Sequence, residues 1–231
     1  MRRPACVRRL DAMTIDTGPA IRTPASRAAA LPVALVAGLL LGVLDFLWIK
    51  FVPGPFGGLG NSVAVWAVAA FLLTFRHRWT LRVSLLAAGV QLIVAVPAYH
   101  LAAALIQHDD PANAYDTTAL AWAGLGVVAA LVFGTGGALA RGARTPDTVR
   151  HLALALPGAV LFAEAGLQLR RIGEPSYSTG ALTAYAAILL FLGLLTTVLM
   201  VPAWRRRGLV LALALPLTAA GFVAFDLTGL H

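Results

Sequence analysis

The chain has 231 residues, of which 59% are hydrophobic and 12% are charged, and its mean hydropathy is +0.82. One soluble core of this size does not need so many apolar residues, so the composition excludes a soluble globular domain and predicts a protein that lies in a lipid bilayer. The net charge of +8 comes from 17 Arg and one Lys in short clusters between apolar runs. Such clusters are typical of cytoplasmic loops, and we therefore expect no nucleic-acid partner.

The first 27 residues are basic, rich in Pro, Thr and Ala, and without apolar periodicity. This pattern predicts a disordered cytoplasmic tail over 1–27, followed by a single transmembrane domain over 28–231. The apolar run after the tail has no small-residue cleavage pattern, so we expect a retained helix rather than a secretory signal, with Met13 as an alternative start. Cys6, in the tail, is the only cysteine, which excludes an intrachain disulfide.

Seven apolar runs reach or approach the roughly 20 residues that a helix needs to cross a hydrocarbon core of about 30 Å. In chain order they lie at 29–49, 60–75, 81–106, 118–140, 151–169, 179–204 and 208–230. Because a backbone in lipid must satisfy its own hydrogen bonds, the runs predict helices, and the fold class is an all-α polytopic transmembrane bundle of about seven spans. The second run is short, and a re-entrant segment there would leave six spans.

The basic residues predict the orientation of the bundle. A cytoplasmic N-terminus places 15 of the 18 basic residues on the cytoplasmic side and leaves only Lys50, Arg170 and Arg171 outside. The positive-inside rule therefore favours this orientation. We expect a multi-pass protein of the cell inner (plasma) membrane, with the lipid bilayer as its partner.

Polar side chains interrupt several apolar runs at a similar depth. Asp45 and Glu164 each lie about 20 Å from the cytoplasmic edge, which places both in the outer half of the bilayer. Further polar residues at or beyond this depth are Asn61, Ser62, His100 and Asp226. Because a charged side chain at the bilayer centre costs about 2.5–3.5 kcal/mol, we expect the two acids to face protein or a water-filled cavity.

Asp45 shares one helix face with Gly38 and Gly42, at spacings of three and four residues. A stripe of small residues lets another helix approach closely, so Asp45 is predicted to point into the bundle. Asp45 is therefore a candidate binding residue. An ion pair with Lys50, or a contact with a neighbouring helix, is the alternative interpretation.

Glu164, Gln168 and Arg171 form an i, i+4, i+7 stripe in the fifth run, so Glu164 has a hydrogen-bonding neighbour and a cation on its own face. A structural ion pair of Glu164 with Arg170 or Arg171 is the alternative to a binding role. The candidate binding cluster comprises Asp45, Asn61, Glu164 and Gln168.

The remaining patterns do not indicate chemistry. The glycine-rich stretch over 126–138 lacks dinucleotide-binding spacing and predicts close helix packing through Gly126, Ala130, Gly134 and Ala138. The acidic loop over 108–116 is typical of a hydrated outer turn rather than of a cation site. Neither a zinc-protease helix motif nor a Gly-x-Ser-x-Gly turn occurs, so we expect no metal and no cofactor and favour a non-enzymatic protein.

The stretch LGNSVAVWAVAAFL, residues 59–72, carries the pattern Leu-x-Asn-Ser-x-x-x-Trp after a Pro- and Gly-rich loop. It resembles an uncharacterised family of small actinobacterial multi-pass membrane proteins, known only as a domain of unknown function. The resemblance implies a helical inner-membrane protein without an assigned activity and transfers no catalytic residue. From the residues themselves, Asn61 or Ser62 can cap the second helix. Trp66 faces the same side as Ser62, as a packing residue or as a pocket wall.

Two functions remain open. The first is a membrane protein that binds or transports a small solute or ion through an outer-half polar cavity formed by the candidate cluster. The second is a non-enzymatic membrane scaffold or accessory subunit in which the same groups hold helices together, with a protein partner that the sequence does not identify. One cavity lined by both Asp45 and Glu164 would favour the first function.

Overall fold

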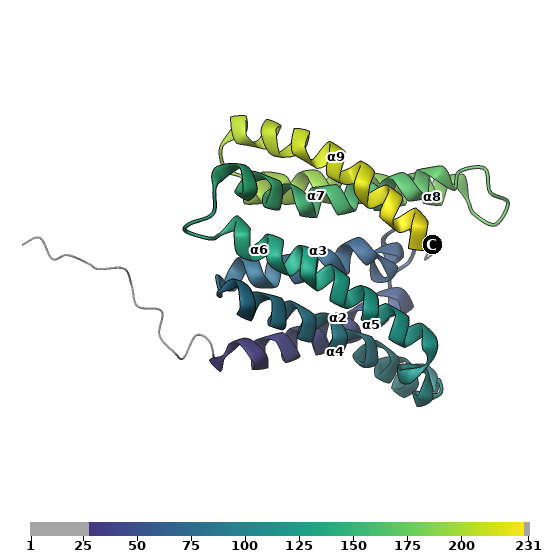
Figure 1. The fold of residues 1–231 in the computed structure, drawn as a ribbon. Helices are drawn as coiled ribbons and strands as arrows, with labels where there is room; N and C mark the ends of the chain where they lie inside the picture. Colours follow the sequence, from purple (N-terminus) through teal and green to yellow (C-terminus); the bar gives the residue numbers. More distant parts are fainter. Residues whose placement is uncertain (1–27, 229–231) are drawn as a thin grey trace, which may run out of the picture.

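The computed structural model describes residues 28–228, so the predicted tail over 1–27 lies outside the described residues. In the described part, every regular element is helical (Figure 1). In chain order the elements are α2 Ala30–Phe51, the 3₁₀ helix η1 Phe56–Asn61, α3 Val63–His77, α4 Leu81–Gln107, the 3₁₀ helix η2 Pro111–Tyr115, α5 Thr117–Ala129, the π-helical turn η3 Ala130–Gly134, α6 Thr135–Ala140, α7 Asp147–Arg170, α8 Thr179–Met200 and α9 Trp204–Thr228. Because α5, η3 and α6 follow one another without a break, they form one continuous rod.

The predicted apolar runs correspond to these helices, and the all-α fold class is confirmed. Six of the described helical segments are long and apolar enough to cross a membrane. By length and composition they are the helices of a multi-pass membrane protein. The predicted end at 204 and start at 208 were wrong by a few residues: α8 ends at Met200 and α9 begins at Trp204. Pro202 lies in the gap, where a residue without an N–H cannot continue the helix ladder.

Helix α3 is the exception in length. It has 15 residues and is therefore about 22 Å long, which is shorter than a hydrocarbon core of about 30 Å. The prediction that the second run is short is confirmed. Its N-terminus lies inside the bundle rather than at the outer surface, because the connection from α2 folds back along α2.

The connection from α2 to α3 folds back along α2. The indole N–H of Trp48 donates to the carbonyl oxygen of Phe56 at 2.8 Å. A Cβ placed on Gly60 would lie 2.9 Å from the carbonyl oxygen of Asp45, so only a glycine permits this approach. Helix α3 consequently begins beside Asp45, about 9 Å before the end of α2 measured along the helix axis.

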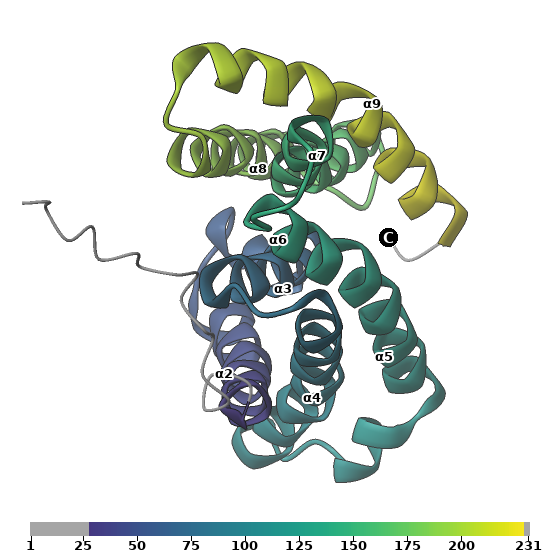
Figure 2. The same ribbon diagram turned by 60° about the vertical axis from the view of Figure 1, so that its left-hand side comes forward.

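The helices form two groups, which Figure 2 shows side by side. Helices α2, α3 and α4 pack with the α5–α6 rod, and α7 packs with α8 and α9. Helix α7 also contacts α3 and α6, so it joins the groups. In an apolar stretch of 18 residues in α7, 67% of the residues are buried, whereas the corresponding share in α9 is 11%. Helix α7 is therefore the central helix, whereas α9 directs most of its surface outward.

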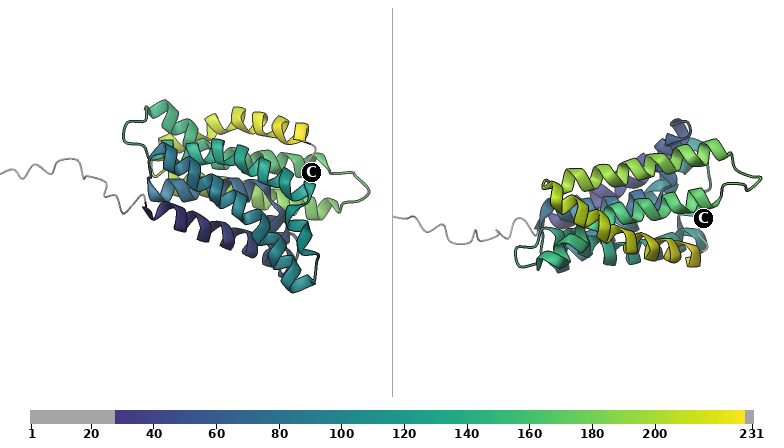
Figure 3. Two further views of the ribbon diagram at one scale, coloured as in Figure 1. Left: turned by 60° about the horizontal axis from the view of Figure 1, so that its bottom comes forward. Right: turned by 90° about the horizontal axis from the view of Figure 1, so that it is seen from above.

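Three turns with arginines in or beside them lie at one end of the bundle, whereas Arg170 and Arg171 lie at the other end. These turns join α3 to α4, α6 to α7 and α8 to α9, and Figure 1 shows all three at the same end. The turns between α4 and α5 and between α7 and α8 lie at the other end, as the two views in Figure 3 also show. This segregation is what the positive-inside prediction requires. The end without these turns is called the outer end below.

Candidate functional site

A cavity of about 180 Å³ lies near the outer end, enclosed by α2, the start of α3, α4 and α5. Its polar and aromatic lining residues are Asp45, Asn61, Ser62, Trp66, Tyr99, His100, Thr118 and Trp122. Asn61 and Thr118 are exposed, so the cavity reaches the surface, and Leu92 closes its deeper side as a fully buried residue.

Helix α2 places Asp45 on the cavity wall through its glycine stripe. A Cβ on Gly38 would lie 2.5 Å from the carbonyl oxygen of Gln91, and one on Gly42 would lie 2.1 Å from the carbonyl oxygen of Ala95. The main chains of α2 and α4 are therefore in direct contact over this stripe. The prediction that these glycines admit another helix and turn Asp45 inward is confirmed.

The opposite wall depends on a second stripe of small residues. A Cβ on Gly126 would lie 3.2 Å from the Cβ of Leu92, and one on Gly134 would lie 2.7 Å from the Cβ of Ala88. Ala130, between them, is buried. The predicted close packing of this stretch is confirmed, with α4 as the partner helix. The π-helical turn at Ala130–Gly134 directly follows Ala129, which lines the cavity. Such a turn changes which face of the helix the residues before and after it present.

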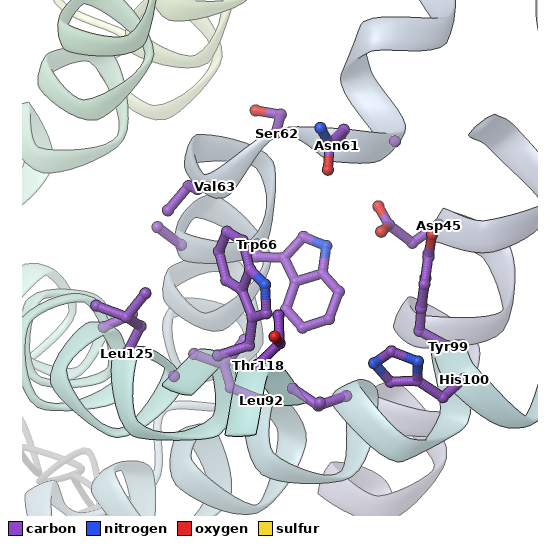
Figure 4. Close-up of a pocket in the computed structure, with 16 residues that line it drawn as sticks. Asp45, Asn61, Ser62, Val63, Trp66, Leu92, Tyr99, His100, Thr118 and Leu125 are labelled. Carbon is purple, nitrogen blue, oxygen red and sulfur yellow. The ribbon is translucent and has the colours of Figure 1, made fainter. Parts of the chain in front are cut away.

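Aromatic side chains surround the carboxylate of Asp45. The indole N–H of Trp66 is directed at this carboxylate as a hydrogen-bond donor (Figure 4). The ring of Tyr99 packs edge-on against Phe46 at a centroid distance of 5.6 Å and against His100 at 5.3 Å. Figure 4 shows Tyr99 and His100 on the same side of the cavity as Asp45, with Trp66 facing them. These contacts hold flat apolar surfaces around one acidic group.

Glu164 lies behind the start of α3, buried among α3, α7 and α8. Its Oε2 accepts hydrogen bonds from the main-chain N–H of Ala64 at 2.8 Å and from the hydroxyl of Ser62 at 3.0 Å. Its Oε1 lies 2.7 Å from the hydroxyl of Tyr185 in α8. The Ser62 Oγ also accepts the main-chain N–H of Val65 at 3.1 Å, so Ser62 is the N-cap of α3 and, of the two residues that the sequence offered, Asn61 is not. Glu164 and Ser62 together satisfy N–H groups that a helix start leaves unpaired.

The number of protons in this network points to a neutral Glu164. The Tyr185 hydroxyl carries one proton but lies within hydrogen-bond distance of two oxygens, Oε1 of Glu164 and the carbonyl oxygen of Gly58 at 2.9 Å. A protonated Glu164 donates to Tyr185, and Tyr185 then donates to Gly58. Every contact is satisfied in this arrangement, whereas an ionised carboxylate leaves one oxygen without a donor.

The structure separates the four residues of the predicted cluster. Asp45 and Asn61 line the cavity, but Glu164 and Gln168 are not among its lining residues. Ser62 is the link, because it lines the cavity and also donates to Glu164. The expectation of one cavity lined by both acids is therefore not met. The two acids lie on opposite sides of the start of α3.

The basic residues that the sequence offered as ion-pair partners of Asp45 and Glu164 contact other groups in the structure. The ammonium group of Lys50 donates to the side-chain oxygen of Gln107 at 3.2 Å rather than to Asp45. Arg170 forms an ion pair with Asp226 of α9 at 2.5 Å. The guanidinium of Arg171 lies 5.3 Å from the ring centre of Tyr177.

Several residues around the site were missed or given another role by sequence reasoning. His100 was expected only as a polar residue of the outer half, and it lies on the cavity wall together with Tyr99 and Trp122. Tyr185 had no signal, since it is one aromatic residue in a continuous apolar run. Trp66 was placed on the same side as Ser62, and the structure makes it a cavity wall.

Comparisons with known proteins identify the family of the chain. No curated protein and no solved structure matches it. One family model covers residues 21–230, which include all of the helices described above. The chain therefore belongs to DUF6518, a family of unknown function.

Proposed function

We propose that this membrane protein binds a small solute or ion in the cavity between α2, α3, α4 and α5. The observation that supports this proposal is Asp45, an acidic side chain on the cavity wall with no Lys or Arg among the lining residues. Within a membrane span, a charged acidic side chain raises the free energy of the folded protein unless an opposite charge or hydrogen bonds stabilise it. Such a residue commonly marks a solute or ion pathway. A bound solute or ion provides that compensation.

In this proposal Asp45 and Asn61 contact the ligand, since both line the cavity. Glu164 is a positioning residue, because its hydrogen bonds to Ser62 and Ala64 fix the start of α3 and with it one wall of the cavity. Gln168 has no contact role in the proposal, as it lies off the cavity wall.

We also propose the plasma membrane as the location, with the cavity on the outer side. The clustering of the arginine-bearing turns at the opposite end supports this orientation. An actinobacterial origin rests on the resemblance of residues 59–72 alone.

Thermal unfolding of the full chain in lipid nanodiscs tests solute binding. The panel comprises sodium, potassium, ammonium, small amines, polyols and neutral alcohols. The control variant is Val63→Phe, which adds a ring at the start of α3 and fills the cavity. A solute at 100 times its Kd stabilises the folded state by about 2.7 kcal/mol. We expect at least one solute to raise the unfolding midpoint of the wild type but not of Val63→Phe. An equal response of both proteins to the whole panel would contradict the proposal.

Glu164 favours a second candidate, a scaffold or accessory subunit. Its hydrogen bonds join α3, α7 and α8, and Glu164 itself does not line the cavity, which fits a structural group. Native gel electrophoresis of membranes separates the two candidates. A scaffold retains its high-mass complex in Val63→Phe and Asp45→Asn and loses it in Glu164→Ala. A solute-binding protein shows no complex that depends on Glu164.

A further inference from the structure

We propose that the cavity selects a small organic cation, an alkylated ammonium compound of about seven non-hydrogen atoms. This inference rests on the proposed function and names the chemical class of its ligand. It follows from the charge of the cavity wall, the occupied N–H groups at the start of α3, the aromatic faces of the wall and the volume of the cavity.

The charge of the wall is acidic. Asp45 is the only carboxylate among the lining residues, and neither Lys nor Arg lines the cavity. The nearest cation along α2, Lys50, donates to Gln107 instead. The indole of Trp66 gives Asp45 a dipole but no opposite charge. Of the described lining residues only His100 could supply an opposite charge, so a ligand that carries a positive charge can compensate an ionised Asp45.

An anionic ligand is disfavoured although a helix begins at the cavity. The N-terminus of a helix attracts anions through its unpaired N–H groups. In α3 the N–H of Ala64 already donates to Glu164 at 2.8 Å, and that of Val65 donates to Ser62 at 3.1 Å. Two of the donors that could bind an anion at this helix start are thus already occupied by side chains of the protein.

A bare metal ion is also a poor match. Calcium takes about six to eight oxygen ligands, and magnesium needs a nearly complete octahedron. Within residues 28–228, no group of three or more His, Cys, Asp or Glu side chains is arranged to hold a metal ion. One carboxylate among aromatic rings leaves most coordination positions empty.

The aromatic wall suits a weakly hydrated cation. Trp66, Tyr99 and Trp122 line the same space as Asp45, and Figure 4 shows Trp66 facing Tyr99 across it. An ammonium group over an aromatic ring gains a favourable electrostatic interaction, and aromatic cages recognise alkylated ammonium groups in this way. The cavity volume of about 180 Å³ suits a compact molecule.

Equilibrium binding of two probes of matched shape tests the inference. Choline carries a quaternary ammonium, and 3,3-dimethylbutan-1-ol is its neutral analogue. Each is titrated into the full chain in nanodiscs and followed by isothermal calorimetry, with tryptophan fluorescence as a second readout. We expect choline to bind at least about tenfold more tightly than the alcohol, a difference of about 1.4 kcal/mol.

Four variants locate the interaction. Asp45→Asn keeps the shape of the side chain and should weaken choline binding at least about tenfold, with little change for the alcohol. Trp122→Leu should weaken choline binding about two- to thirtyfold, and Trp122→Phe should restore part of it. Glu174→Gln removes an exposed acid at the same outer end and should change neither affinity. Size-exclusion chromatography and circular dichroism show whether each variant is folded.

The outcomes separate this inference from the proposed function. Equal affinity for choline and the alcohol overturns the cation class but supports a cavity that binds solutes. Choline binding that is unchanged in both folded Asp45→Asn and folded Trp122→Leu overturns the assignment to this cavity. If neither probe binds, the alkylated ammonium class is excluded, and the wider solute panel then decides the proposed function.

Discussion

The main-chain N–H of Ala64 and the side chain of Glu164 form a hydrogen bond of 2.8 Å across 100 residues of sequence. This bond ties the buried start of α3 to the central helix α7. Since Ser62 belongs to the same network and also lines the cavity, the bond connects the core of the bundle to the candidate site. The start of α3 needs such a partner, because Ser62 and Ala64 are buried and a helix start leaves its first N–H groups without a partner in the helix.

Replacement of Glu164 tests whether this group is neutral. Glu164→Gln offers an N–H donor to Tyr185 and an oxygen acceptor to Ala64 and Ser62, so it should preserve nearly full stability. Glu164→Ala should lower the free energy of unfolding by about 1–3 kcal/mol for each buried donor that it leaves unpaired. Unfolding by sodium dodecyl sulfate in mixed micelles measures both, with Glu174→Ala as an exposed control. Equal damage from Gln and Ala would show that an ionised carboxylate is required.

The contact between α2 and α4 should tolerate no side chain at Gly42. In Gly42→Ala the new Cβ meets the main-chain oxygen of Ala95 at 2.1 Å, so the helices must separate. We expect a loss of about 1–3 kcal/mol in the free energy of unfolding. Gly89→Ala is the matched control, because nothing lies within 4 Å of a Cβ at that position of α4. It should be neutral or stabilising by up to about 1 kcal/mol. The reverse order of stability would refute this packing.

The orientation of the bundle predicts which loops face the outside. In a Cys6→Ser background, Asn113→Cys lies in the turn between α4 and α5, and Arg144→Cys lies in an arginine-bearing turn. A membrane-impermeant thiol reagent should label the Asn113→Cys protein in intact cells and the Arg144→Cys protein only after permeabilisation. The opposite labelling pattern would invert the topology and place the cavity on the cytoplasmic side.

Much of the fold could be predicted because lipid imposes a simple rule on the sequence. A run of about 20 apolar residues has to be a helix in a bilayer, and most of the predicted runs agree with helices to within a few residues. The stripe of Gly38, Gly42 and Asp45 also gave the correct inward face, since small residues mark where another helix comes close.

The sequence predicted that both acids face protein or a cavity, but not which of them lines the cavity. Counting residues from the cytoplasmic edge placed Asp45 and Glu164 at the same level, but it gives no information about which helices are neighbours. The start of α3 lies between the two acids, so only Asp45 reaches the cavity. Tyr185 could not be found from sequence, because its partners Gly58 and Glu164 lie in segments whose packing depends on the whole bundle.

The most direct test of the central claim, that the outer cavity binds a solute, is protection of a cavity residue by that solute. In the Cys6→Ser background, Thr118→Cys introduces a thiol on the cavity wall without altering a proposed contact residue. Its rate of reaction with a water-soluble thiol reagent is measured with and without a saturating concentration of the solute that stabilises the wild type. The account predicts a reaction that the solute slows at least about tenfold. A thiol that never reacts, or one that reacts at the same rate in both conditions, would contradict it.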